Sequence, residues 1–171
     1  KPTAPELRPQ FDLVRECLEK MGVKILTCPT FEADDILGTF ARRCEEAGIP
    51  ALLVTGDRDS MQLVTKTSNV LYTRRGVSDV VRYTPEKVLE DFGVTPAQIP
   101  DLKGLMGDAS DNIPGIPGIG EKTAIKLLSA YGTLENALDH AEADLKGKQR
   151  EKMIDGRMSG LMSKKIATIT R

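Results

Sequence analysis

Apolar residues in the first part of the chain alternate between helical spacing and short continuous runs. Helical spacing predicts helices over Pro5–Met21 and Ala33–Ala47, each followed by a glycine. Continuous runs predict strands over Lys24–Thr27 and Ala51–Thr55, the second of them buried in a parallel sheet. The faces expected in the core hold Phe11, Val14, Leu18 and Met21 in the first helix and Ile36, Leu37, Phe40, Ala41 and Cys44 in the second.

Three more elements are predicted before residue 84. A short helix is expected over Asp59–Leu63, followed by strands over Val70–Tyr72 and Val80–Tyr83. Helices that alternate with strands in this way indicate a layered α/β core.

The pattern changes at Thr84. Thr84-Pro85 and Thr95-Pro96 each look like a helix N-cap with proline at the first helical position. The rest of the chain is typical of short helices joined by Gly and Pro turns, including the lysine-rich tail from residue 143 onward. We therefore predict an α/β domain over residues 1–83 and a helical region over residues 84–171.

Composition adds little to this outline. The 24 basic and 25 acidic side chains give a net charge of −1, so bulk charge does not announce a nucleic-acid partner. No run reaches the roughly 18 apolar residues of a membrane span, so no membrane partner is expected. The single His140 is expected on a helix surface. Cys17, Cys28 and Cys44 form no metal motif, and buried free thiols in a reducing, cytoplasmic compartment are expected.

Seven carboxylates gather in three short clusters, each where the chain is expected to turn. Any one cluster is compatible with ordinary helix capping or a solvated turn, but three together are costly unless a cation neutralises them. Hard divalent cations prefer oxygen ligands of this kind, and two such ions are the apparatus of phosphodiester hydrolysis. The candidate metal ligands are Glu32, Asp34, Asp35, Asp57, Asp59, Asp108 and Asp111.

Four of these acids are the candidate catalytic group. Asp34, Asp35, Asp57 and Asp59 are predicted to converge within reach of one metal ion or one metal pair, because ligands in open α/β sheets bind beyond the carboxyl ends of strands. Arg58 between two of them is a candidate to stabilise a phosphate.

A glycine-rich turn is the second strong feature. Gly115–Gly120 is predicted to be a tight apolar hairpin that leads into a helix burying Ala124, Leu127 and Leu128. Glycines allow close approach to a phosphate, and the helix N-terminus offers free N–H groups. Such a turn grips a nucleic-acid backbone without reading bases, although a plain helix–turn–helix corner would have the same pattern. The candidate DNA-binding residues are Gly115, Gly118, Ile119, Gly120, Lys122, Thr123 and Lys126.

Five segments carry a family resemblance. In their order and spacing the chain resembles the 5′-nuclease domain of bacterial DNA polymerase I, a member of the flap endonuclease superfamily. The resemblance covers residues 1–140 and extends into the tail. The segments are FEADDILGTFA, TGDRDSMQLV, YTPEKVLEDFGVTP, LMGDASDNIPGIPGIGEKTA and LLSAYGTLENAL.

This resemblance implies a PIN-like parallel-sheet core followed by a helical helix–hairpin–helix region. It implies two Mg²⁺ or Mn²⁺ ions held by the seven acids, with Asp108 and Asp111 serving the second ion, and K⁺ at the hairpin turn. The implied partner is double-stranded and flap DNA, the implied location is the bacterial nucleoid, and the parent protein is expected to carry a C-terminal polymerase domain.

The family pattern also includes features that this sequence lacks. Family members carry a preceding strand with a further metal-binding Asp and a helical arch with Lys and Arg, so the core is expected to be incomplete at its N-terminus. The leading hypothesis is a 5′-3′ exonuclease and flap endonuclease domain. The competing hypothesis is a catalytically incomplete fragment that binds branched DNA. An unrelated α/β phosphatase is a third, against which the hairpin argues, since small phosphoesters need no duplex grip.

Overall fold

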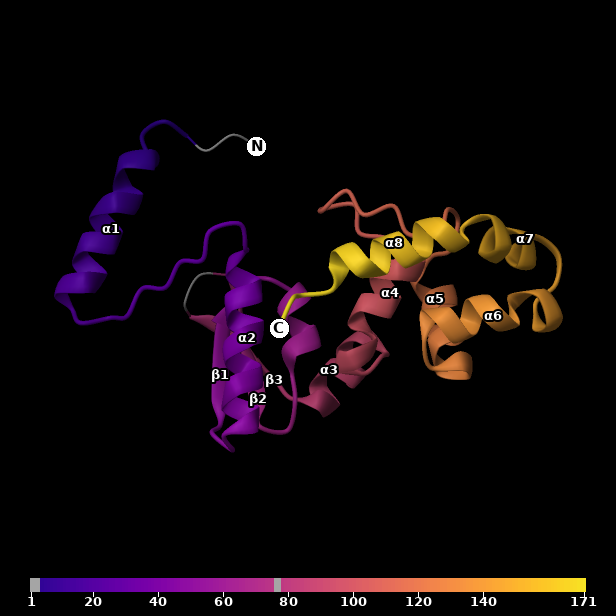
Figure 1. The fold of residues 1–171 in the computed structure, drawn as a ribbon, viewed down its shortest axis with the longest axis horizontal. Helices are drawn as coiled ribbons and strands as arrows, with labels where there is room; N and C mark the ends of the chain where they lie inside the picture. The colour runs from indigo at the N-terminus through magenta and orange to yellow at the C-terminus, as the bar shows by residue number, and fades with distance from the viewer. Residues whose placement is uncertain (1–3, 76–77) are drawn as a thin grey trace.

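A three-stranded sheet forms the centre of the α/β part. The computed structural model describes residues 4–75 and 78–171. Its strands are β1 (Ala51–Thr55), β2 (Ser68–Arg75) and β3 (Asp79–Tyr83), in the order β1-β2-β3. β1 pairs parallel to β2 and β2 pairs antiparallel to β3, so the parallel arrangement expected from the sequence holds for one pair. Figure 1 shows the sheet with α2 (Ala33–Glu46) packed beside it.

The short helix η1 (Asp59–Leu63) leads from β1 into the core. It is a 3-10 helix, and Met61 and Leu63 are fully buried against Val70 and other core residues. This burial fixes the start of η1, where the acidic turn lies.

The chain after Tyr83 is helical, as the sequence predicts. Thr84 caps the first helix by accepting a hydrogen bond from the backbone N–H of Lys87, with Pro85 at the first helical position. Thr95 and Gln98 form a reciprocal capping box at the next one. The elements are α3 (Pro85–Phe92), η2 (Pro96–Gln98), α4 (Ile99–Met106), α5 (Glu121–Tyr131), α6 (Leu134–Asp144), α7 (Gly147–Asp155) and α8 (Arg157–Ala167).

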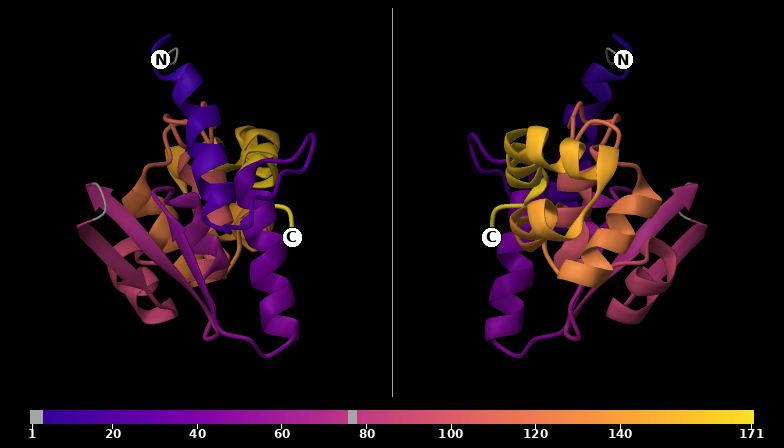
Figure 2. Two further views of the ribbon diagram at one scale, coloured as in Figure 1. Left: turned by 90° about the vertical axis from the view of Figure 1, so that its left-hand side faces the viewer. Right: turned by 90° about the vertical axis from the view of Figure 1, so that its right-hand side faces the viewer.

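Helix α8 lies along α4 and links the helical region to the α/β part. Lys164 of α8 forms an ion pair with the buried Asp101 of α4 at 2.6 Å, and Asp101 also accepts the backbone N–H of Leu134 at 2.8 Å. Figure 1 shows α8 running from the helical region toward α2, and both views of Figure 2 place the C-terminus beside α2.

Helix α1 (Arg8–Lys20) forms within the predicted range but stands apart from the rest of the molecule in Figure 1. It buries no residue in this structure, so the expected core positions Phe11 and Val14 are both 54% exposed. Helix formation here follows local signals, whereas burial needs a partner surface.

Three more expectations about the core are wrong. Lys24–Thr27 is irregular rather than a strand, because a strand requires a hydrogen-bonded neighbour and the described sheet begins at β1. Phe40 is exposed, and only Ala41 of the predicted α2 core positions is buried. β1 is not buried on both faces: Leu53 points into the core, while its neighbours Leu52 and Val54 are more than half exposed.

The thiols also differ from expectation. Cys17 and Cys28 are exposed and Cys44 is partly buried, although all three are free. Cys17 lies on the unpacked helix α1, which explains its exposure. His140 is on the surface of α6, as predicted. No helix among the described residues is long and apolar enough to cross a membrane.

Candidate functional site

The turn after β1 positions the first pair of acids. The backbone N–H of Asp57 donates to the Thr55 hydroxyl at 3.0 Å, and the backbone N–H of Asp59 donates to the Asp57 carboxylate at 2.9 Å. These bonds turn the chain sharply at the carboxyl end of β1 and place Asp59 at the first residue of η1. This is the edge of an α/β sheet at which ligands bind.

The loop after α4 positions the second pair. Asp108 and Ile113 exchange two backbone hydrogen bonds, at 2.8 and 2.9 Å, which close the intervening residues into a tight loop. Inside it, both the backbone N–H and the hydroxyl of Ser110 donate to Asp108. The loop therefore holds the carboxylates of Asp108 and Asp111 on the side that faces η1.

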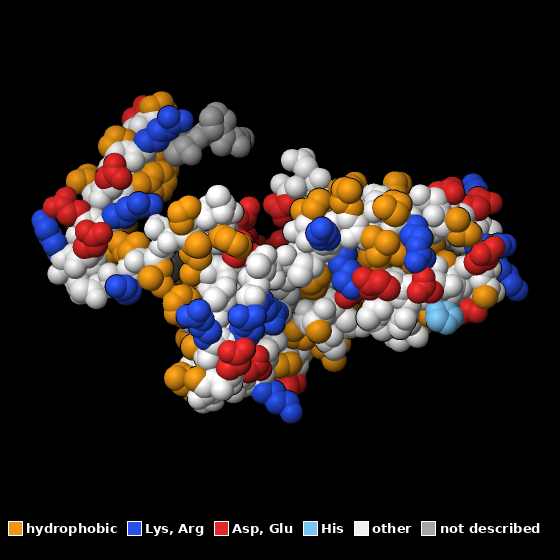
Figure 3. All heavy atoms as spheres, viewed as in Figure 1, with side chains coloured by type: hydrophobic (Ala, Val, Ile, Leu, Met, Phe, Trp, Pro, Cys, Tyr) orange, Lys and Arg blue, Asp and Glu red, His pale blue; other side chains and the backbone are white. Residues whose placement is uncertain are grey.

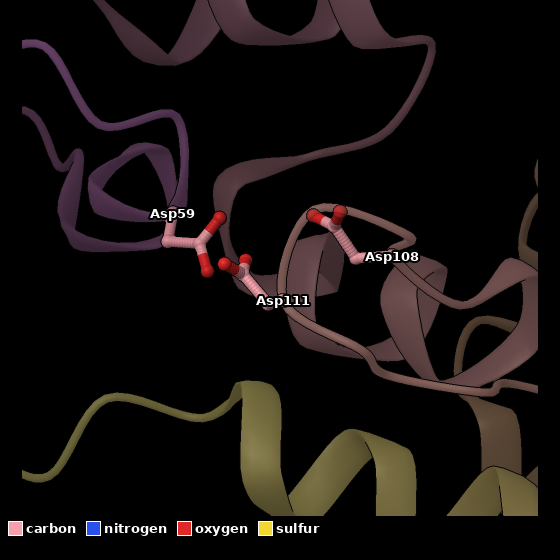
Figure 4. Close-up of side chains that lie close together, drawn as sticks. All are labelled: Asp59, Asp108 and Asp111. Atoms are coloured by element: carbon pink, nitrogen blue, oxygen red, sulfur yellow. The ribbon is translucent and has the colours of Figure 1, made fainter. Parts of the chain in front are cut away.

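Acids from the two segments meet in space. One carboxylate oxygen from each of Asp59, Asp108 and Asp111 lies within 4.8 Å of the others. Figure 4 shows the side chain of Asp59 facing those of Asp108 and Asp111, which come from the loop after α4. Residues about 50 positions apart thus form one cluster. Local sequence patterns could not predict this contact.

A lysine that sequence reasoning missed occupies this cluster. The Lys103 ammonium donates to Asp59, lies 2.7 Å from an Asp108 oxygen and is 3.6 Å from an Asp111 oxygen. Its side chain is 11% exposed and comes from α4, whose other positions are mostly apolar. The available signal was a single lysine on this apolar helix, one turn before Gly107 and the acids.

Charge and burial shift the protonation of these groups in opposite directions. The Lys103 ammonium, with help from Ser110, lowers the pKa of Asp108 to about 2. For Asp59, burial raises the pKa and outweighs the lowering effect of Lys103. Burial alone would lower the pKa of Lys103, but its bonds to Asp108 and Asp59 raise it. Lys103 is therefore charged at neutral pH.

The third acidic cluster, at the start of α2, divides into two roles. Asp35 accepts the backbone N–H of Glu32 at 3.1 Å and the backbone N–H of Thr170 at 2.8 Å, so it caps α2 and holds the C-terminal segment. Burial, followed by repulsion from Asp57 and Asp59, raises the pKa of Asp34. The structure thus brings Asp34 to the acids after β1, while both oxygens of Asp35 are engaged by backbone groups.

A single open hollow of about 690 Å³ unites six of the seven acids. Figure 3 shows acidic side chains beside the recess between the α/β part and the helical part. Arg58 lines this hollow and also a second one, whose lining includes Arg74 and Lys103. The acidic residues that line the first hollow are Glu32, Asp34, Asp57, Asp59, Asp108 and Asp111.

The glycine-rich hairpin forms as the sequence predicts. Ile116 and Ile119 are buried and anchor the turn, which closes through a 3.0 Å bond from the Ile119 N–H to the Ile116 carbonyl. Gly120 then precedes α5, whose buried residues are the predicted Ala124, Leu127 and Leu128.

A shallow hollow of about 280 Å³ lies at the start of α5, lined by Gly118, Ile119, Thr123 and Lys126. Lys152 of α7 also reaches it and donates to the Gly118 carbonyl at 2.9 Å, a contact that local sequence patterns could not reveal. Lys122, also predicted to bind DNA, is exposed at the beginning of α5 and does not line this hollow.

Two family models together match the whole chain. The description "5′-3′ exonuclease, N-terminal resolvase-like domain" matches residues 1–93, and "5′-3′ exonuclease, C-terminal SAM fold" matches residues 94–171. Curated relatives include DNA polymerase I of Bacillus caldotenax, 49% identical over 99% of this chain, and that of Bacillus subtilis, 46% identical over 98%. The chain spans about a fifth of the length of these relatives, 19% in both cases.

Solved structures share the fold. A T5 5′-exonuclease with divalent metal ions (zinc) bound has a TM-score of 0.79 at 22% identity, over 96% of this chain and 62% of that protein. The catalytic core of Rad2 in complex with DNA substrate has a TM-score of 0.61 at 18% identity, over 98% of this chain and 56% of that protein. At these identities the likeness shows the architecture alone.

Proposed function

The chain belongs to the 5′-3′ exonuclease family, and from that membership we propose that it is a divalent-metal-dependent nuclease domain that cuts DNA at 5′ ends and 5′ flaps. One observation carries the proposal: acids from the β1 turn and the α4 loop meet with carboxylate oxygens within 4.8 Å of one another. Such a cluster beside an open hollow is suited to a cation and a phosphate rather than to a structural core.

The donor set fits a hard divalent cation. All donors are carboxylate oxygens, and the Lys103 ammonium among Asp59, Asp108 and Asp111 shows that a positive charge is accommodated there. These three residues would hold one ion, and Asp34 and Asp57, with Glu32 nearby, would hold a second. Mg²⁺ or Mn²⁺ would supply an activated water and stabilise the charge that develops on the phosphate. Zinc in the T5 5′-exonuclease supports a divalent requirement.

Three charged residues of the chain, Asp108, Arg58 and Asp35, have distinct proposed roles in the site. Asp108 acts as a ligand rather than as a proton donor, because its low pKa keeps it ionised at neutral pH. Arg58 lines both hollows at the edge of the acids and is placed to contact a phosphate oxygen. Asp35 caps α2 and also lines an adjoining hollow together with Glu32, Asp34 and Asp59, so it would support the site from its edge.

The hairpin is proposed to hold the duplex. Residues Gly115, Gly118, Ile119 and Gly120 would bring backbone close to a phosphate, with the α5 N-terminus and Lys122, Thr123 and Lys126 beside it. The Rad2 core, which shares the fold, is known in complex with DNA substrate, and this supports DNA as the partner of the chain. A K⁺ ion at the hairpin remains a proposal, and it would compete with Lys152 for the Gly118 carbonyl.

The division of the chain also stays a proposal: residues 1–83 as the α/β core and 84–171 as the DNA-holding region. Asp108 and Asp111 come from the second region, so the cutting site would lie at the junction of the two. The relatives are bacterial DNA polymerase I proteins, which supports a parent protein with a polymerase domain that acts in the bacterial cytoplasm.

A second candidate is DNA binding without cleavage. Lys103 favours it, since the chain's own ammonium already neutralises the converging acids. In that case flap DNA would bind through the hairpin and no phosphodiester bond would break.

A labelled 5′-flapped duplex separates these candidates. With Mg²⁺ we expect cleavage near the flap junction, none with EDTA and none of p-nitrophenyl phosphate under the same conditions. Binding of the flap without cleavage would favour the binding fragment, and hydrolysis of the small phosphoester alone would favour a phosphatase.

A further inference from the structure

Helix α8 is fastened to the hairpin at its first two turns. The Ser159 hydroxyl donates to the Gly115 carbonyl at 2.6 Å, and the Gly115 N–H donates to the Ser163 hydroxyl at 2.9 Å. Ser163 is fully buried, so the bond to its hydroxyl has no competing water. Both polar groups of one hairpin residue are therefore held by two serines one turn apart on the same helix.

Packing reinforces these bonds. Ile116, 1% exposed, sits against Gly156 and Gly160. A Cβ atom at these positions would come within 2.5 and 2.9 Å of the isoleucine side chain, so the glycines make the notch that receives it. The hairpin is thus seated in α8 by shape as well as by hydrogen bonds.

The opposite end of α8 is fastened to the acidic site. The buried Gln62 amide donates to the Ala167 carbonyl at 2.9 Å and accepts the Ile169 N–H at 3.0 Å. Gln62 belongs to η1, three residues after Asp59. One residue further along the tail, the Thr170 N–H donates to Asp35.

The middle of the helix is braced on α4, which carries Lys103. Lys164 pairs with Asp101 of α4 at 2.6 Å and with Glu135 of α6 at 2.7 Å, so α8 is tied to both helices. Figure 1 shows the resulting path, from the helical region to the C-terminus beside α2.

We propose that α8 is a strut that fixes the hairpin relative to the carboxylates, with Gln62 and Ser163 as positioning residues at its two ends, and that it thereby sets which phosphodiester bond is cut. This inference rests on the proposed function, since it takes the hairpin as the duplex grip and the acids as the cutting site. A shift of about 1 Å at a reacting centre can lower a rate about 100-fold, so the length of the strut matters.

The test maps the cut position at single-nucleotide resolution on a 5′-flapped duplex. Gln62→Ala and Ser163→Ala are each expected to lower the rate at the main position about tenfold and to add products cut at neighbouring positions. Gln98→Ala is the matched control, because Gln98 also donates to backbone carbonyls, those of Leu128 and Gly132, but away from α8. It should leave the cut position unchanged.

A double variant separates a strut from two independent contacts. If loss of the contact at one end is enough to release α8, the double variant Gln62→Ala with Ser163→Ala should cleave no more slowly than the slower single variant. If the two contacts were independent, their free-energy losses would add, and the double variant would be slower than either single variant. Ser159→Ala replaces Ser163→Ala if the buried substitution prevents folding. Additive losses, or unchanged cut positions in both single variants, would overturn the proposal.

Hydrogen exchange gives a readout that does not require cleavage. Gln62→Ala should speed amide exchange across residues 157–171 and in the hairpin 115–120, and Gln98→Ala should not. Faster exchange confined to η1 would overturn the strut. If the wild-type chain does not cut the flap but Gln62→Ala still speeds exchange in both regions, the proposed function is contradicted and the coupling of the hairpin to η1 through α8 is supported.

Discussion

Lys103 sets the charge balance at the scale of single residues. It is a nearly buried cation shared by Asp59, Asp108 and Asp111, two of which are themselves less than a quarter exposed. Removing one partner of a buried ion cluster leaves the others uncompensated, whereas exposed pairs contribute little. The loss of stability on removing Lys103 should lie between these limits, because Asp59 and Asp108 are mostly buried while Asp111 is 54% exposed.

Lys103→Met is therefore expected to destabilise the metal-free protein by about 1–3 kcal/mol. Mg²⁺ should restore most of this loss, because the variant presents carboxylates without their competing ammonium. Urea unfolding with and without Mg²⁺ measures both effects.

Lys164→Met is the control for that experiment, since Lys164 also pairs with two carboxylates, Asp101 and Glu135, in a different place. It should cost stability that Mg²⁺ does not restore. Equal Mg²⁺ responses in the two variants would contradict a metal site at Lys103.

Asp108 makes the metal-free protein sensitive to acid. Its pKa is about 2 in the folded chain and about 3.9 when unfolded, so its stabilisation is present above about pH 4 and lost as the pH falls toward 2. Burial raises the pKa of Asp34 and Asp59, so these groups act in the opposite sense and favour folding as they become protonated. We expect Asp108→Asn to remove roughly 1–2 kcal/mol of the stability lost between pH 4 and pH 2. Urea unfolding in EDTA across this range measures it, and identical pH profiles for variant and wild type would contradict the Lys103–Asp108 pairing.

At the scale of elements, the hairpin and the start of α5 line one hollow and are proposed to bind a phosphate together. Thr123 and Lys126 lie beside Gly118 around the same hollow. A phosphate held there would be recognised by charge and backbone N–H groups, so affinity should not depend on base sequence.

Lys126→Ala should weaken duplex binding by a similar factor on all sequences. If the ammonium contacts one phosphate, the slope of log affinity against log salt should fall by about 0.9. Titrations at several salt concentrations measure the slope, with Lys66→Ala, an exposed lysine before β2, as the control. An unchanged slope would show that the Lys126 ammonium does not contact a phosphate.

Gly118→Val should weaken binding more than Lys126→Ala does. Gly118 has φ +79°, which L side chains rarely adopt, and an added Cβ would lie 2.6 Å from the Lys152 ammonium. The substitution therefore strains the turn and displaces Lys152 from its carbonyl. Duplex affinity compared at one salt concentration is the measurement, and wild-type affinity in the valine variant would rule out a close backbone approach at this turn.

Elements whose signals are local were predictable from the sequence. The cap Thr84 with Pro85, the apolar spacing of α5 and the turn after β1 all depend on neighbours within a few residues. The predictions of a strand at Lys24–Thr27 and of a buried face on α1 failed, because each depends on a partner surface that local sequence patterns do not reveal. Phe40 failed for the same reason: helical spacing identifies a face but does not say what covers it.

At the scale of the whole molecule, the site depends on contacts between distant segments. The acids could be identified in the sequence because they cluster locally, whereas Lys103 and the Asp35–Thr170 bond join residues that only the fold brings together. The structure thus places the acidic cluster near one end of α8 and the glycine-rich hairpin at the other. We expect the acidic cluster to cleave the phosphodiester bond and the hairpin to bind the duplex.

Affinity and single-turnover cleavage rate, measured on one 5′-flapped duplex for two variants, test this division of labour most directly. Asp111→Asn should lower the cleavage rate about 100-fold or more while duplex affinity stays within about threefold, since it removes a ligand and some repulsion toward DNA. Lys126→Ala should do the reverse, weakening affinity while the rate at saturating protein stays near that of the wild type. Parallel losses of rate and affinity in both variants, or an Asp111→Asn chain that cleaves at the wild-type rate, would contradict the account.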